Sequence, residues 1–408
     1  AVSRGEFFGL IADKLGLAAS DSAQQLPQDV ASGSPYADSV RVLMERKVLF
    51  GFPDGTVRPD EPIKADHAAY LLARLMGVED ADAAAFLREK YGVNWSDPLS
   101  YEEASQAVAR VLDTDPELVS ILKQSTEQQL AQKSYRASAE QKMSFAFSED
   151  APPELAAMLA DLSTTMEMEY HQEDGMHIAM TIAVPEGLRG EGEEAPEAFT
   201  IEQYLVPEGW FMNMADPLTG EVRWIAMDEE LLSLNQLQQT QRFSMEYFDA
   251  LMSTKSFFYR HEGEKEVNGV PAYQIGFNGK VASYEELLKM LQPFMLDEQS
   301  TEQLTEMITE IDGILKGAKM AGTMWLDQET LLPVRAEMTM TIQFAENPSL
   351  PFTSISAEMT MEFYDYNQVE AIELPPEAEE AEEFSPEFDG GMEEPEETPS
   401  EETVDPAE

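Results

Sequence analysis

The sequence predicts an α+β protein in which an N-terminal group of helices precedes a curved antiparallel β-sheet that is covered by helices on one face. Two patterns along the chain support this class. Apolar residues recur at three- and four-residue spacing up to residue 113, as in amphipathic helices. After Ala137 the period falls to two, which is typical of half-buried strands. The 408 residues suffice for two or three domains.

The expected N-terminal helices repeat along the chain. Each copy of the first type sets an aliphatic residue before a polar cluster and continues with apolar residues at helical spacing. These copies are 2–17, 63–78 and 99–113. Helices of a second type are expected at 36–49 and 82–93, with loops at 50–62 and 94–98. We therefore expect a helical repeat domain over 1–113, followed by a polar helical linker over 114–138.

Two of the three copies carry a helix-start signal. Ser3 with Glu6, and Ser100 with Glu103, have the spacing of a capping box, in which each side chain binds a backbone N–H left free at the helix start. The middle copy has Lys64 and His67 at these positions and lacks the box.

The segments of period two predict a large, mainly antiparallel sheet over 139–375, because tight turns join several of them. The expected strands are 142–147, 164–172, 175–184, 199–206, 209–215, 221–227, 256–263, 270–278, 322–328, 333–344 and 354–366. Helices are expected at 228–253, 283–296 and 301–317.

Charge and composition exclude several classes of function. The chain has 79 acidic and 26 basic residues, a net charge of −53, so nucleic acid and anionic membranes are poor partners. There is no cysteine for disulfides, thiolate metal sites or nucleophilic catalysis. No apolar run approaches the roughly 20 residues of a membrane span. Residues 376–408 are acidic without Lys or Arg, which predicts a disordered tail.

The chain begins within an expected helix, so we expect that a signal peptide and some upstream sequence precede Ala1. The acidic surface is also typical of proteins that work in high salt or outside a cell.

The N-terminal units resemble S-layer homology (SLH) repeats, which join a helix, a G-[YF]-P-D-G-T-x-x-P loop, an I-T-R-A-E box and a second helix. Residues 51–59, GFPDGTVRP, match the loop, and residues 2–7, VSRGEF, match the box. The resemblance implies a secreted protein at the cell wall or cell surface that binds a secondary wall polysaccharide, often a pyruvylated one. Only Arg4 keeps the basic residue of the box, so at most one working groove is expected.

The candidate glycan-binding residues are Arg4, Glu6, Gly51, Asp54, Gly55 and Thr56. Two interpretations of the loop stay open. Its glycines, prolines and Asp54 are explained by turn structure alone. Turn structure does not explain Arg4 in a first helical turn, where the helix dipole disfavours a cation, whereas a guanidinium can bind carboxylate or ketal oxygens through two hydrogen bonds.

The second part is similar to LolA/LolB-like lipoprotein carriers and to related Gram-positive envelope proteins. The motifs are EGWFMNM (208–214), GVPAYQIGFN (269–278) and MWLDQETLLPVRAEMTMTI (324–342). The resemblance implies a half-barrel of antiparallel strands whose mouth is filled by helices, a shape that can hold acyl chains.

Methionine pairs and histidines are the candidate metal ligands in this sequence. The M-x-M pairs begin at Met166, Met212, Met338 and Met359. Thioethers select Cu(I), but alternation puts both members of a pair on one sheet face, which favours core or cavity lining. His171 and His177 flank an expected hairpin without the ligand spacing of a metal site. No phosphate-binding loop, dinucleotide fingerprint or serine-nucleophile motif is present, and no cofactor is expected.

The sequence therefore favours a non-enzymatic cell-envelope protein with two partners, a secondary cell-wall polysaccharide and a lipid or lipoprotein. Three alternatives stay open. A purely structural surface-layer protein would have a solidly packed half-barrel, an envelope hydrolase would have a buried carboxylate pair in a cleft, and a regulator that senses envelope ligands would resemble a carrier in sequence.

Overall fold

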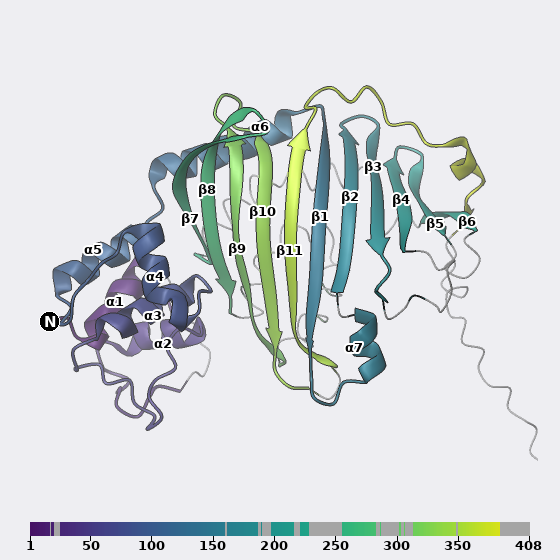
Figure 1. Ribbon diagram of the computed structural model, residues 1–408. Coiled ribbons are helices and arrows are strands. Elements are labelled where there is room, and N and C mark those ends of the chain that lie inside the picture. The colour runs from purple at the N-terminus through teal and green to yellow at the C-terminus, as the bar shows by residue number, and fades with distance from the viewer. Residues whose placement is uncertain are drawn as a thin grey trace, which may run out of the picture.

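A computed structural model gives the structure of residues 1–16, 18–19, 25–159, 161–186, 189, 197–215, 221–227, 255–282, 286, 302, 306, 313–347 and 350–383. In this part of the chain, a group of helices lies beside one large open sheet (Figure 1). The sheet is antiparallel apart from one short pairing at its edge. The predicted α+β class with a large antiparallel sheet is therefore confirmed.

The helical unit consists of α1 (Arg4–Leu15), α2 (Ala37–Glu45), α3 (Ala65–Leu75), α4 (Asp80–Tyr91) and α5 (Tyr101–Leu112). Both predicted capping boxes form: the hydroxyls of Ser3 and Ser100 accept hydrogen bonds from the N–H groups of Glu6 and Glu103. Lys64, which precedes α3, makes no side-chain cap.

The three copies of the first helix type meet at the aliphatic residues that open them. The Val2 N–H donates to the Leu99 carbonyl at 2.9 Å, and the Ile63 N–H donates to the Val2 carbonyl at 3.0 Å. All three side chains are buried in one core together with Phe7 and Leu72. The repeat pattern therefore produces a single shared hydrophobic core rather than separate units.

The strands form one sheet in the order β12-β6-β5-β4-β3-β2-β1-β11-β10-β9-β8-β7. Their bounds are β1 (Ser134–Phe147), β2 (Asp161–His171), β3 (Gly175–Ala183), β4 (Ala198–Val206), β5 (Gly209–Ala215), β6 (Val222–Met227), β7 (Phe257–Val267), β8 (Val270–Val281), β9 (Leu315–Asp327), β10 (Pro333–Phe344), β11 (Phe352–Tyr364) and β12 (Glu382–Glu383). Every strand expected from period two is present. β1 and β11 lie side by side at the centre, although they are the first and last long strands of the sheet.

Some boundaries differ from those expected. The expected linker, 114–138, is helical in α6 (Pro116–Ala131), but β1 already begins at Ser134. The expected helix 301–317 is wrong at its end, since β9 begins at Leu315 and pairs with β10 there. The cause in both cases is pairing with a distant strand, which local spacing does not report. The expected helices 228–253 and 283–296 lie outside the described residues, apart from Glu286.

Two further elements were not expected. A short helix, α7 (Pro153–Leu159), follows β1. Residues 376–383, the start of the expected disordered tail, form the 3-10 helix Pro376–Glu380 and the edge strand β12, which pairs parallel with β6. The rest of the expected tail lies outside the described residues.

The two faces of the sheet differ in chemistry, because residues paired across antiparallel strands share a face. On what we call the apolar face, Met166 is opposite Met180, and Met338 is opposite Met359. On the polar face, Glu337 is opposite Thr360. The register places both members of each M-x-M pair on the apolar face, as alternation predicted.

The sheet contacts helices on both faces. On the apolar face, Leu118 and Leu122 of α6 pack against Ile275 and Leu326, and Figure 1 shows α6 crossing the ends of the neighbouring strands. On the other face, the Lys90 Nζ of α4 lies 3.1 Å from Glu262 Oε1 of β7. The helical unit is thus fastened to the β7 side of the sheet.

Candidate functional site

The loop between α2 and α3 holds its shape by its own hydrogen bonds. The Phe52 N–H donates to the Thr56 carbonyl at 2.8 Å, and the Gly55 N–H donates to the Phe52 carbonyl at 2.9 Å. Gly51 has φ +80°, and a Cβ there would lie 2.9 Å from the Thr56 carbonyl oxygen, so this turn requires glycine.

Asp54 stabilises the tip of this loop. Its Oδ1 accepts hydrogen bonds from the Thr56 hydroxyl at 2.6 Å and the Thr56 N–H at 3.1 Å, and its Oδ2 accepts from Arg58 Nη2 at 3.0 Å. These bonds, first from Thr56 and then from Arg58, lower the pKa of Asp54 to about 2. The carboxylate therefore stays ionised and keeps the loop closed at any physiological pH.

Arg4 lies beneath the same loop, although 47 or more positions separate it from the glycine turn in sequence. Its Nε donates to the Val57 carbonyl at 2.7 Å, and its guanidinium lies 4.8 Å from the Phe52 ring centre. Only 6% of Arg4 is exposed, and burial lowers the pKa of its guanidinium. The structure thus places Arg4 against Phe52 and Val57 of the loop that carries Gly51, Asp54, Gly55 and Thr56.

Glu6 does not join this group. Its Oε2 accepts a hydrogen bond from the Ser3 N–H at 2.7 Å, which completes the capping box. It also lines a cavity of about 520 Å³ between α1 and α2. Because Arg4 and Glu6 are two positions apart on one helix, their side chains point in different directions.

Three residues that are not among the predicted site residues also contact the loop or Arg4, namely His67, Asp29 and Arg58. His67 Nδ1 lies 3.1 Å from Arg4 Nη1. The Asp29 carboxylate accepts from the N–H groups of Val57 and Arg58, and Arg58 stacks on Phe52 at 4.1 Å. In the sequence, His67 stands out only as a departure from the I-T-R-A-E box. Packing between separate loops brings Asp29 here, and no local pattern reports that.

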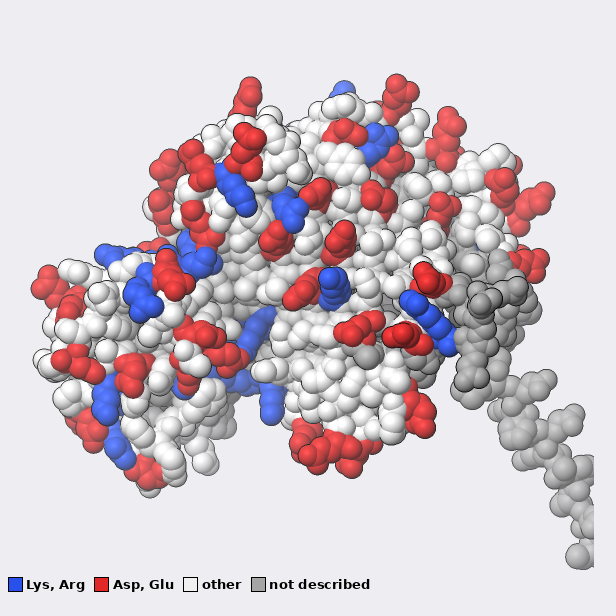
Figure 2. Space-filling view, in the orientation of Figure 1, with Lys and Arg blue, Asp and Glu red and all other residues white. Residues whose placement is uncertain are grey.

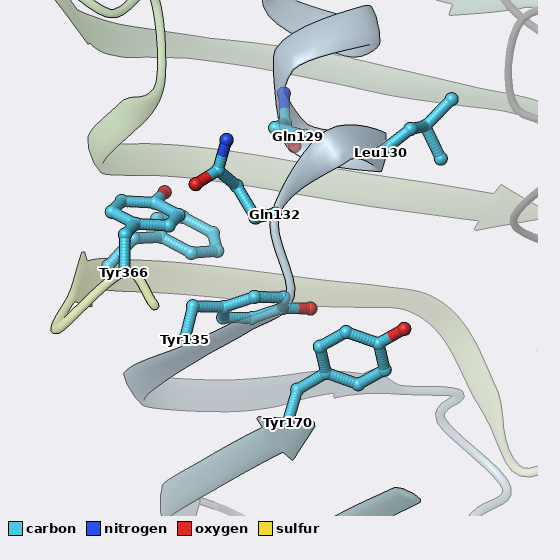
Figure 3. Close-up of a pocket in the computed structure, with 7 residues that line it drawn as sticks. Gln129, Leu130, Gln132, Tyr135, Tyr170 and Tyr366 are labelled. Atoms are coloured by element: carbon cyan, nitrogen blue, oxygen red, sulfur yellow. The ribbon is translucent and has the colours of Figure 1, made fainter. Parts of the chain in front are cut away.

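A second candidate site lies at one end of the apolar face (Figure 3). It is a pocket of about 210 Å³, called the tyrosine pocket, lined by Gln129, Leu130, Gln132, Tyr135, Tyr170, Phe363 and Tyr366. The rings of Tyr135 and Tyr170 are 5.1 Å apart, and Figure 3 shows both hydroxyls pointing to the same side below the end of α6. Burial raises the pKa of Tyr135 to about 12. The phenol is therefore a neutral hydrogen-bonding group in a pocket lined by aromatic and glutamine side chains together with Leu130.

His171 and His177, which flank the predicted hairpin, lie near carboxylates. His171 Nδ1 lies 3.0 Å from Asp174 Oδ2. His177 lies between Glu169 and Glu202, at 3.7 and 3.8 Å, and stacks on Tyr204. Among the described residues, no group of three or more His, Asp or Glu side chains could hold a metal ion. None of the helices in this part of the chain is long and apolar enough to cross a membrane.

A glycine-rich Pro-Asp-Gly-Thr loop on a helical repeat, joined to a large open antiparallel sheet, defines a protein of two structural parts. Residues 28–65, which contain α2 and this loop, match the family model described as "S-layer homology domain". The predicted SLH resemblance is thereby confirmed, and with it an association with the cell envelope. Residues 117–383 match the model of DUF6612, a family of unknown function, and the chain belongs to this family.

Comparison with solved structures gives matches of low sequence identity. Lipoprotein LppX from Mycobacterium tuberculosis is 11% identical, with 64% of this chain and 100% of that chain covered and a TM-score of 0.31. LprF from Mycobacterium bovis is 10% identical, with 65% and 98% covered and a TM-score of 0.33. A putative outer membrane lipoprotein-sorting protein domain from Vibrio parahaemolyticus is 10% identical, with 62% and 93% covered and a TM-score of 0.20.

A comparison with curated proteins gives no match.

Proposed function

We propose that the protein is a non-enzymatic cell-envelope protein, held at the wall by its helical unit, with a sheet that binds a lipid or another apolar ligand. The observation that carries the first part is the SLH match over 28–65 together with Arg4 lying beneath the matched loop. The proposed wall partner is a secondary polysaccharide with anionic groups.

The contacts of the loop suggest separate roles for its two arginines. Arg4 is almost fully buried and bonded to Val57, so it positions the loop rather than reaching a polymer. The Arg58 side chain is 40% exposed, and its guanidinium carbon lies over the Phe52 ring at 4.1 Å from the ring centre. A guanidinium in this position can bind a carboxylate through two hydrogen bonds beside an aromatic ring that contacts the sugar. We therefore assign glycan contact to Arg58 and the exposed tip around Asp54 and Gly55.

Wall binding is tested by sedimentation of the full chain with purified cell walls. We expect the wild-type chain to sediment, and Arg58→Ala to weaken binding about tenfold, since a hydrogen bond to a charged group contributes about 1.5–3 kcal/mol. Arg88→Ala, an exposed cation on α4, is the matched control and should bind as the wild type does. Failure of the wild-type chain to sediment would contradict wall binding. An equal loss with Arg88→Ala would show that only net charge matters.

The apolar face supports the second part of the proposal. Methionine and aliphatic residues oppose one another across β9, β10 and β11, as in the pair Met320 and Met340. Met320, Met338 and Met359 are only partly buried. Methionine adapts to ligands of irregular shape, and the tyrosine pocket at one end of this face offers hydroxyl groups beside apolar surface. An acyl chain with a polar end group suits this arrangement.

Apolar binding is tested with a fluorescent fatty acid added to the full chain. We expect saturable binding that Met338→Glu weakens at least tenfold, because a carboxylate on the apolar face must lose its water to make room for the ligand. Thr339→Glu, the neighbouring position on the polar face, is the matched control and should leave binding unchanged. Native mass spectrometry then identifies any lipid that copurifies. A wild-type chain that takes up no fatty acid would favour a purely structural surface protein with a packed sheet.

A further inference from the structure

A cavity between the helical unit and the sheet gathers positive charge in a strongly acidic protein. Its volume is about 470 Å³. Figure 2 shows Lys and Arg side chains collected in the hollow where the two parts meet. The cations that line it are Lys47, Arg74, Lys280, Lys316 and Lys319, against the two carboxylates of Glu79 and Asp80. The lining thus carries an excess of three positive charges (5 − 2) in a chain whose net charge is −53.

The two carboxylates of this basic cavity are already engaged. Asp80 receives two hydrogen bonds from Arg74, at 2.6 and 2.8 Å, and Glu79 pairs with Lys319. Lys280 Nζ donates to the carbonyl of Lys47 at 2.8 Å. Among the described residues, neither Lys280 nor the exposed Lys316 has a carboxylate within ion-pair distance.

The charges around Lys280 disfavour its protonated form. Burial, followed by the charges of Lys319, Lys47 and Arg74, lowers the pKa of Lys280 to about 8. The charge of Glu286 raises the pKa of Lys280, but the Glu286 carboxylate also lies 3.2 Å from the Arg46 guanidinium. A negative charge placed in the cavity would therefore stabilise the protonated form of Lys280.

We propose that the basic cavity binds a small oxyanion, a ligand bearing phosphate or carboxylate groups, between Lys280 and Lys316. An anion elsewhere on this acidic surface is repelled, so the cavity concentrates anions locally. Phe50, 65% exposed, stands at its edge under the Arg74 guanidinium at 5.2 Å. A sugar or another partly apolar body next to the anionic group can pack on this ring. This site is independent of the loop and of the apolar face proposed above.

The test is calorimetric titration of the full chain with inorganic phosphate and with citrate, each at constant ionic strength. We expect saturable binding of at least one of them, and Lys316→Ala, at an exposed position, to weaken it about tenfold. Lys280→Met should weaken it at least as much. Lys142→Ala, an exposed lysine on β1, is the control and should change nothing.

Citrate binding should also weaken between pH 7 and pH 9, because the pKa of Lys280 is lowered to about 8 and its ammonium group loses its proton in this range. No saturable binding of either anion to the wild-type chain would overturn the proposal. Binding that survives Lys316→Ala and Lys280→Met unchanged would also overturn it, since the anion would then lie elsewhere. A preference for phosphate over citrate, or the reverse, assigns the chemical class.

Discussion

We expect Arg4→Ala to lower the free energy of unfolding by about 2–5 kcal/mol and to abolish wall binding with it. The substitution leaves the Val57 carbonyl without its donor in a buried place, which costs about 1–3 kcal/mol. It also removes the cation between Phe8 and Phe52, an interaction of about 1–2 kcal/mol when desolvated. Chemical denaturation followed by circular dichroism measures the loss.

Two further measurements separate positioning from direct contact. In Arg4→Ala, hydrogen exchange of the amides of 51–58 should accelerate, whereas in Arg58→Ala it should accelerate much less while wall binding falls, because the bonds of Asp54 to Thr56 and of Asp29 to Val57 remain. Arg4→Lys keeps the charge but cannot reproduce the planar guanidinium that bonds Val57 and faces the rings, so it should recover only part of the stability. An Arg4→Ala variant with unchanged exchange and lost wall binding would contradict the positioning role.

The second large effect is expected at the junction of the helical unit with the sheet. Glu262 of β7 accepts hydrogen bonds from Arg260, Lys90 and Gln274, and the side chains of Arg260 and Glu262 are each 10% exposed. Removing one partner of such a pair leaves a buried charge uncompensated, which costs about 3–5 kcal/mol. Glu262→Ala should therefore be among the most destabilising substitutions on this strand.

The loss of Glu262 should also weaken the connection between the helical unit and the sheet. Because Lys90 belongs to α4, Glu262→Ala should also uncouple the two parts, and scanning calorimetry should resolve the unfolding of the helical unit from that of the sheet. Glu264→Ala, on the same strand and exposed, is the control and should change stability by less than about 0.5 kcal/mol. A single unchanged transition in Glu262→Ala would refute the junction.

The sequence could predict what local spacing encodes. Period two located the strands from β1 to β11, and the S-x-x-E spacing located the starts of α1 and α5. The loop at 51–59 was identifiable because its turns require glycine at Gly51 and Gly55.

What was missed depends on partners far away in the chain. The start of β9 is set by its pairing with β10, and β12 exists only because Glu382 and Glu383 reach β6. Glu6 and Arg4 share one sequence motif, yet helical geometry separates their side chains. The basic cavity combines lysines from both parts of the protein, so no window of sequence contains it.

The position of β1 beside β11 determines when this sheet can be completed during synthesis. On one side of that pair the strands run in chain order from β1 to β6, and on the other side from β7 to β11. Each of these two groups pairs only neighbours in the chain, so it can form as soon as it emerges from the ribosome. The central pairing joins Arg136 to Tyr364, so it must wait until almost the whole family domain has been made. The edge of β1 that will pair with β11 is therefore exposed for most of the synthesis of this domain, and it is the surface that a chaperone would have to shield.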